Sequence, residues 1–318
     1  MIKKMERMLY SEYGIQALSL QEIPPGWSAS AWKVNAECGD YFLKVYHKHK
    51  PSTKSWVARI GDYMPVVLWL YENKGLQGKM TAPLLTKDGA YKWEDTAFLY
   101  MVFPFIDGQT IGSDKLKPAQ VCEIAQIISE LHSYGAEIPV PTDILRETFD
   151  VSFCTVLSDR LKNIHNAIQL KGMLAPYQDT LIQAMETLQE LADLLRNSKI
   201  QYVLCHTDIH GWNLMQSSKL ILIDWEGLKL APAEADLFSF TETFFFEYAW
   251  EDVMSIYRTV HKDYRVNADA IRFYRLRRRL EDIFEFVERI LFDNLAQDDA
   301  NRSLRYLKQE CDLLNTVL

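Results

Sequence analysis

The sequence predicts an α+β protein with two lobes, an antiparallel β-sheet in the N-terminal lobe and a mainly helical C-terminal lobe. Short segments with strand-like alternation are concentrated in the first third of the chain, and apolar residues at helical spacing dominate from Leu116 onwards. A chain of 318 residues, 48% of them apolar, is long enough to bury two cores. We place the lobes at residues 1–103 and 104–318, with a hinge at about residues 100–108.

The overall charge and the cysteines limit the kinds of partner and compartment. The net charge is −8, with 43 acidic and 35 basic residues, which disfavours a nucleic-acid partner and suits a cationic small molecule. The five cysteines are scattered and never form a C-x-x-C pair, as is typical of a reducing cytoplasm. We find no signal-peptide core and no apolar stretch long enough to span a bilayer. We therefore expect a cytoplasmic protein without a membrane partner, and its oligomeric state stays open.

The N-terminal lobe is expected to begin with a helix over residues 3–13 and to contain five strands. These strands are expected at residues 17–21, 31–36, 40–46, 81–85 and 97–103. A helix over residues 53–73 follows the third strand, and Pro65 within it should kink or restart it.

Small and turn-forming residues separate the first two strands, at residues 24–30. Such a loop lets backbone N–H groups approach phosphate oxygens without obstruction by side chains, and Gly26, Ser28 and Ser30 could serve this purpose. The stretch is not G-x-G-x-x-G, however, and an ordinary hairpin turn has the same composition.

The C-terminal lobe is predicted to consist of amphipathic helices around one polar segment. Helices are expected at residues 118–132, 153–167 and 177–197, and over most of 237–318. Residues 142–149 lie between the first two helices, where we expect a structural role.

The polar segment, His206 to Asn213, lies between two short apolar runs that we read as a hairpin of strands at residues 202–205 and 220–223. It carries Asp208, and Asp224 follows the second strand directly. Phosphoryl transfer needs such a set of residues. One carboxylate orients the acceptor hydroxyl, and an amide and a second carboxylate hold Mg²⁺ against a triphosphate.

The spacing H-x-D-x-H-x-x-N followed by I-D-W-E resembles the aminoglycoside phosphotransferase and choline kinase family, which shares the protein-kinase fold. The resemblance implies that Asp208 is catalytic and that Asn213 and Asp224 bind Mg²⁺. It further implies supporting roles for three residues of the loop and its surroundings: His206, His210 and Asp236. The expected function is transfer of a phosphoryl group from ATP to a hydroxyl of a small molecule.

The same resemblance implies a nucleotide site in the N-terminal lobe. Lys44 stands in F-L-K-V, where kinases carry V-A-I-K, and would pair with the α and β phosphates. Ser28 would lie in the phosphate loop. The run from Leu99 to Gly108 matches the interlobe hinge, where adenine would lie near Met101 and bond the Pro104 carbonyl and the Ile106 N–H. The alternative frame uses Phe103 with Phe105.

Kinases position this lysine with a glutamate from the following helix. Glu72 lies near the far end of the expected helix, and Asp62 is nearer but shorter and offset. We therefore name Asp62 as the candidate partner of Lys44, and this is where the sequence departs most from the family pattern.

The acceptor is expected to bind among the C-terminal helices. The stretch YRLRRRLEDI resembles a helix of spectinomycin phosphotransferases, which makes Glu281 and Asp282 candidates, with Glu242 among the aromatic residues before it. The arginine run itself is typical of a charged, solvated helix face. The resemblance favours a cationic aminoglycoside or aminocyclitol antibiotic, while choline, homoserine and sugars remain open.

Two other interpretations of the same residues are a zinc site and a protein without catalytic activity. His206 and His210 have the i, i+4 spacing of zinc ligands, but that spacing suits zinc on a helix and Gly211 argues against one. A non-catalytic kinase-like binding protein also stays open, because the phosphate loop is irregular and Lys44 has no obvious partner.

Overall fold

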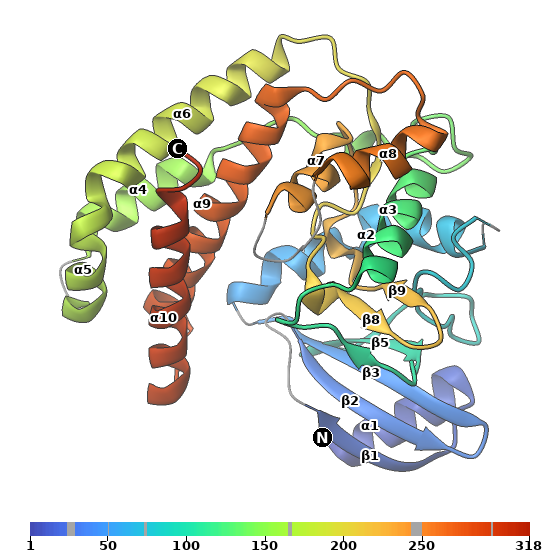
Figure 1. Ribbon diagram of the computed structural model, residues 1–318. Helices are drawn as coiled ribbons and strands as arrows, with labels where there is room; N and C mark the ends of the chain where they lie inside the picture. Colours follow the sequence, from blue (N-terminus) through green and yellow to red (C-terminus); the bar gives the residue numbers. More distant parts are fainter. Residues whose placement is uncertain (24–28, 50, 73–74, 165–166, 243–249, 294) are drawn as a thin grey trace.

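The computed structural model describes residues 1–23, 29–49, 51–72, 75–164, 167–242, 250–293 and 295–318 (Figure 1). Its N-terminal part is a five-stranded antiparallel sheet in the order β1-β2-β3-β5-β4. The strands are β1 (Ala17–Ile23), β2 (Ser30–Ala36), β3 (Gly39–His47), β4 (Trp93–Glu94) and β5 (Phe98–Pro104). The antiparallel sheet that the sequence predicts is therefore confirmed.

Alternation along β3 sends neighbouring side chains to opposite faces of this sheet. Leu43 and Val45 are buried in one core with Met5 of helix α1 (Ile2–Met8). Tyr46 belongs to the other, larger core, which also contains Met101 of β5. Lys44 shares its face with Tyr46 and thus points toward the helical part of the molecule.

The strand expected at residues 81–85 is wrong, and of the kink or restart expected at Pro65 the restart is not found. Residues 81–85 form no strand, although the Leu84 N–H donates to the Val102 carbonyl (2.7 Å), and β4 takes the edge position instead. Helix α2 (Pro51–Glu72) continues through Pro65 without restarting. Pro65 and Gly61, whose carbonyl loses its helical partner, are both exposed, so water can replace the missing hydrogen bond.

The C-terminal part is mainly helical, as the sequence predicts. In Figure 1 the long helices α6 (Gln178–Arg196), α9 (Ala268–Phe292) and α10 (Gln297–Leu314) lie together on one side of the molecule, and α9 contacts both of the others. Among the described residues no helix combines the length and the apolar character needed to cross a bilayer. The helices are α3 (Pro118–Leu131), α4 (Phe153–Asn163), α5 (Ile168–Leu174), α6 (Gln178–Arg196), α7 (Glu234–Leu237), α8 (Trp250–Val260), α9 (Ala268–Phe292) and α10 (Gln297–Leu314).

The short strands around the polar segment do not form the expected hairpin. Strand β7 (Val203–Cys205) pairs with β10 (Lys229–Ala231), whereas β8 (Leu214–Gln216) pairs with β9 (Leu220–Leu222) and β6 (Gln109–Thr110). The segment His206 to Asn213 therefore links two separate ladders. Strands of three residues are too short for alternation to reveal their pairing.

Candidate active site

One buried carboxylate holds the backbone of the loop that follows β7. Asp236 of α7 accepts the backbone N–H groups of His206 (2.9 Å) and Thr207 (2.5 Å), which is the contact that the resemblance implies. Thr207 has a φ of +66°, which β-branched residues rarely adopt. The Thr207 hydroxyl donates to the carbonyl of Gly227 (2.7 Å). Glycine is needed at position 227, because a Cβ there would lie only 2.6 Å from the Thr207 hydroxyl oxygen. These contacts hold the loop in a strained shape.

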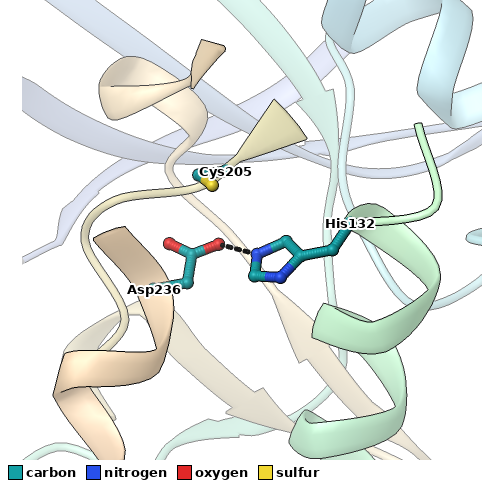
Figure 2. Close-up of side chains that lie close together, drawn as sticks. All are labelled: His132, Cys205 and Asp236. Atoms are coloured by element: carbon teal, nitrogen blue, oxygen red, sulfur yellow. Dashed lines mark hydrogen bonds and ion pairs between the residues drawn. The ribbon is translucent and has the colours of Figure 1, made fainter. Parts of the chain in front are cut away.

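Asp236 lies in a buried cluster with His132, which follows the last residue of α3, and Cys205 of β7 (Figure 2). The possible ligand atoms of these three residues lie within 4.8 Å of one another, as in a metal site. However, His132 Nε2 lies 3.0 Å from Asp236, and its Nδ1 lies 2.9 Å from the Tyr257 hydroxyl. Burial raises the pKa of the Cys205 thiol well above its usual range. Since both ring nitrogens of His132 are engaged by side chains, the cluster is a structural support of the loop.

His206 is buried beneath the loop and ties it at two points. Its Nδ1 accepts the backbone N–H of Asp208 (3.3 Å), and its Nε2 donates to the carbonyl of Ile223 (3.0 Å). Burial lowers its pKa, so the ring is neutral and this tautomer satisfies both nitrogens. Trp225 packs edge-on against it, with 4.8 Å between ring centroids.

The Asp208 carboxylate is one third exposed and contacts three side chains. Its Oδ1 accepts a hydrogen bond from Arg278 Nη1 and lies 3.2 Å from His210 Nε2, while Oδ2 accepts from Asn213 Nδ2 (2.8 Å). Burial by itself would raise the pKa of Asp208, but His210 and Arg278 outweigh it and hold this pKa well below its usual range. Asp208 is therefore ionised and oriented. Arg278 lies 70 residues from Asp208, and no motif in the sequence indicates that the two side chains meet.

Asn213 and Asp224, the expected metal ligands, keep oxygen atoms free for a cation. Among the described residues no hydrogen bond is made to Asn213 Oδ1 or Asp224 Oδ2. Amide and carboxylate oxygens are the ligands that Mg²⁺ prefers, so this donor set fits the metal that the resemblance implies. Asp224 has a φ of +64°, a conformation rare outside glycine.

Lys44 joins the N-terminal sheet to this site. Its Nζ lies 3.0 Å from Asp224 Oδ1 and 2.5 Å from Glu226 Oε1, and the Tyr46 hydroxyl also donates to Glu226. Burial would lower the pKa of Lys44, but the two carboxylates reverse the effect and raise it. Burial, followed by the charge of Asp224, raises the pKa of Glu226.

The proposed pairing of Lys44 with Asp62 is not found. Among the described side chains the ion-pair partners of Lys44 are Asp224 and Glu226. The helix that carries Asp62 packs against the 3₁₀ turn η5 (Trp225–Gly227), which presents Glu226 instead. The one sequence feature that points to Glu226 is its place in the I-D-W-E motif, two residues after Asp224.

On the nucleotide role that the resemblance implies for Lys44, we expect Glu226→Gln to weaken Mg·ATP binding by about tenfold, because a charged hydrogen bond that positions Lys44 is lost. Asp62→Asn should leave the affinity unchanged. Calorimetric titration of both variants with Mg·ATP checks this. A larger loss in Asp62→Asn than in Glu226→Gln would contradict our assignment of the Lys44 partner.

The expected adenine edge lies at the end of β5. Met101 is buried opposite Lys44, Pro104 is exposed and Ile106 is half-buried. The N–H of Phe105 donates to the Asp40 carbonyl (3.1 Å). The alternative adenine pairing, with Phe103 and Phe105, would therefore need a donor that is already bonded. The expectation for Ser28 lies outside the described residues.

The three acidic candidates for acceptor binding are all paired with arginines of α9. Both oxygens of Glu242 are engaged, and Glu281 and Asp282 each bond an arginine four residues earlier. Burial raises the pKa of Asp282 to about 6 in spite of its arginine partner. The arginine run is therefore no solvated face, contrary to expectation. The pairs are Glu242 with Arg275 (2.9 Å) and Arg279 (2.8 Å), Glu281 with Arg277 (2.7 Å), and Asp282 with Arg278 (2.8 Å).

An antiparallel sheet, a helical C-terminal part and a D-x-x-x-x-N loop between short strands form the architecture of kinase-like phosphotransferases. Comparison with known proteins agrees. A model of the phosphotransferase enzyme family matches residues 19–297, and the chain therefore belongs to that family. Protein StrN of Streptomyces griseus is 24% identical over 250 residues, which are 73% of this chain and 73% of StrN.

Solved structures show the same fold. Spectinomycin phosphotransferase APH(9)-Ia, in complex with ADP and spectinomycin, is 19% identical with a TM-score of 0.75, covering 100% of this chain and 98% of its own. A thermostable mutant of aminoglycoside phosphotransferase APH(4)-Ia, in complex with AMP-PNP and hygromycin B, is 13% identical with a TM-score of 0.61, covering 99% and 98%.

Proposed function

We propose that this protein transfers the γ-phosphoryl group of ATP to a hydroxyl of a small molecule. The observation that carries the proposal is the contact between Lys44 of the sheet and Asp224 beside the loop of Asp208. This contact brings Lys44, which would position the nucleotide, next to Asp224, which can bind a metal ion. Asp208, which can orient an acceptor, lies in the neighbouring loop.

In the proposed mechanism Asp208 accepts a hydrogen bond from the acceptor hydroxyl and directs its oxygen at the γ-phosphorus. As the new oxygen–phosphorus bond forms, the bond from the γ-phosphorus to ADP breaks, ADP leaves, and Asp208 takes up the hydroxyl proton. Lys44 contacts the α and β phosphates, and Asn213 and Asp224 are the residues that would hold Mg²⁺. When bound, Mg²⁺ neutralises charge on the phosphate oxygens. The rate would come mainly from positioning, since the loop and its buried supports hold Asp208 in place before substrate arrives.

We further propose that adenine lies against the end of β5, between two lobes that meet near residues 103 and 104. The Pro104 carbonyl and the Ile106 N–H would bond its edge. Pro104 can only accept, and the engaged N–H of Phe105 favours this frame over the alternative.

The acceptor that we propose first is an aminoglycoside or aminocyclitol. The support is the fold shared with phosphotransferases solved with spectinomycin and hygromycin B, together with a net charge of −8. One observation favours a second candidate, another hydroxyl metabolite such as a sugar. The acids expected to hold amines, Glu242, Glu281 and Asp282, are already paired with arginines.

A coupled ADP-release assay with Mg·ATP tests the proposal. The acceptor panel contains spectinomycin, other aminoglycosides, choline, homoserine and sugars. We expect ADP release that depends on one acceptor class, which would identify the substrate. Nucleotide binding without turnover on the whole panel would instead favour the non-catalytic kinase-like protein.

A further inference from the structure

Arg278 links the C-terminal helix α9 to the catalytic loop. Its Nη1 donates to Asp208 Oδ1, and its Nε donates to Asp282 Oδ2 (2.8 Å). The Arg278 side chain is 34% exposed and that of Asp282 20% exposed, so both lie at the edge of the site. A planar guanidinium held at two positions has little freedom to turn.

The contacts of Asp208 leave few of its hydrogen-bond acceptor sites open to a substrate. An ionised carboxylate offers about four acceptor sites, two on each oxygen. Arg278 and His210 face Oδ1, and Asn213 takes one site on Oδ2. The remaining site is on Oδ2, so the orientation of the carboxylate decides where an acceptor hydroxyl can bind.

We propose that Arg278 is a positioning residue that fixes the Asp208 carboxylate with Oδ2 open to the acceptor, and that Asp282 anchors Arg278. This rests on the proposed phosphotransferase function. Asp282 is then not an amine-binding residue of the acceptor site. Asp282 lies four residues after Arg278 on the same face of α9, and its Oδ2 accepts from Arg278 Nε. This contact orients the Nη1 group of Arg278 toward the loop.

Positioning explains why the pair would matter for rate. Transfer requires the acceptor oxygen close to the γ-phosphorus and in line with it, and a misplacement of about 1 Å can cost roughly 100-fold in rate. With Arg278 removed, Asp208 keeps His210 and Asn213 but can turn about its Cβ–Cγ bond. Nucleotide contacts, which the proposed mechanism assigns to Lys44, should be unaffected.

The test compares Arg278→Gln, Arg278→Lys, Asp282→Asn and the double variant Arg278→Gln/Asp282→Asn. We expect Arg278→Gln to lower kcat about 10- to 100-fold, while KM for ATP and acceptor change less than about threefold. Arg278→Lys should stay impaired, because an ammonium keeps the charge but cannot hold both carboxylates. Asp282→Asn should lower kcat when it is made in the wild type. It should cause no further loss of kcat when it is made in the Arg278→Gln variant.

The control is Arg272→Gln, which removes an exposed arginine from the same helix, and melting temperatures verify folding. Full activity of Arg278→Lys would overturn the proposal, since charge alone would then suffice. A rise in acceptor KM with kcat intact would overturn it as well and make Arg278 an acceptor-binding residue. Additive losses would show that Asp282 acts without Arg278.

A structural measurement separates this proposal from the function on which it rests. Crystal structures of the wild type and Arg278→Gln, both without ligands, should show one Asp208 orientation in the wild type and a turned or mixed orientation in the variant. The same orientation in both would overturn the positioning role. Absence of acceptor-dependent ADP release by the wild type would defeat the proposed function and leave this comparison valid.

Discussion

Replacing Asp208 by asparagine is expected to lower turnover by about 10²- to 10⁴-fold while nucleotide binding is retained. Asparagine preserves the size of the side chain but loses the carboxylate charge, and its amide nitrogen cannot accept the acceptor hydroxyl. Within the part of the chain that the structure describes, the ion pairs of Lys44 with Asp224 and Glu226 do not involve this carboxylate. Measurement of kcat by ADP release, with calorimetric titration of nucleotide, checks both parts.

The matched control is Asp88→Asn, which makes the same exchange at an exposed turn of the N-terminal part. It should behave as the wild type does. Normal turnover by Asp208→Asn would show that its assigned role is wrong. Loss of nucleotide binding along with turnover would indicate that the variant disturbs the loop rather than the chemistry.

The Glu147→Gln variant is expected to lose roughly 3–5 kcal/mol of unfolding free energy, because it removes a buried carboxylate that pairs with two partly buried cations and leaves Lys229 without its ion-pair partner. Glu147 is 4% exposed and lies 3.0 Å from Lys229 and 2.9 Å from Arg277. It also accepts the backbone N–H groups of Thr148 (2.9 Å) and Phe149 (2.8 Å). Urea unfolding of variant and wild type measures the loss. A difference below about 1 kcal/mol, the scale of an exposed ion pair, would contradict this account.

The same residue predicts an acid dependence of stability. Burial would raise the pKa of Glu147, but Arg277 and Lys229 overcome this and lower it to about 2 from an ordinary 4.5. A carboxyl with a depressed folded-state pKa stabilises the fold above its unfolded pKa, and the contribution is lost as pH falls from about 4.5 to about 2. The wild type should lose stability in this window more steeply than Glu147→Gln. Parallel curves would show that Glu147 does not carry the effect.

The sequence predicted those parts of the site that lie close together along the chain. Asp208, Asn213 and Asp224 stand in one stretch, with spacing that can be matched to a known loop and apolar runs on both sides. Lys44 could be placed because F-L-K-V stands where kinases carry V-A-I-K. The antiparallel sheet and the long helices were likewise visible as periodic patterns.

Contacts between distant segments could not be predicted from one sequence. The family pattern predicts the partner of Lys44 on the next helix, whereas Glu226 lies 182 residues away. Arg278 had the composition of a solvated helix face, and only the packing of α9 over the loop brings it to Asp208. The expected hairpin failed for a similar reason, since partners of three-residue strands are set by tertiary packing.

Transfer of a radiolabelled γ-phosphoryl group from Mg·ATP to the acceptor panel tests the central claim most directly. The account predicts that the label moves to a hydroxyl of one acceptor class, that the wild type and Asp88→Asn do this equally, and that Asp208→Asn does not. Label that stays on ATP, or appears only as inorganic phosphate with every acceptor tried, would contradict the claim that this protein is a small-molecule phosphotransferase.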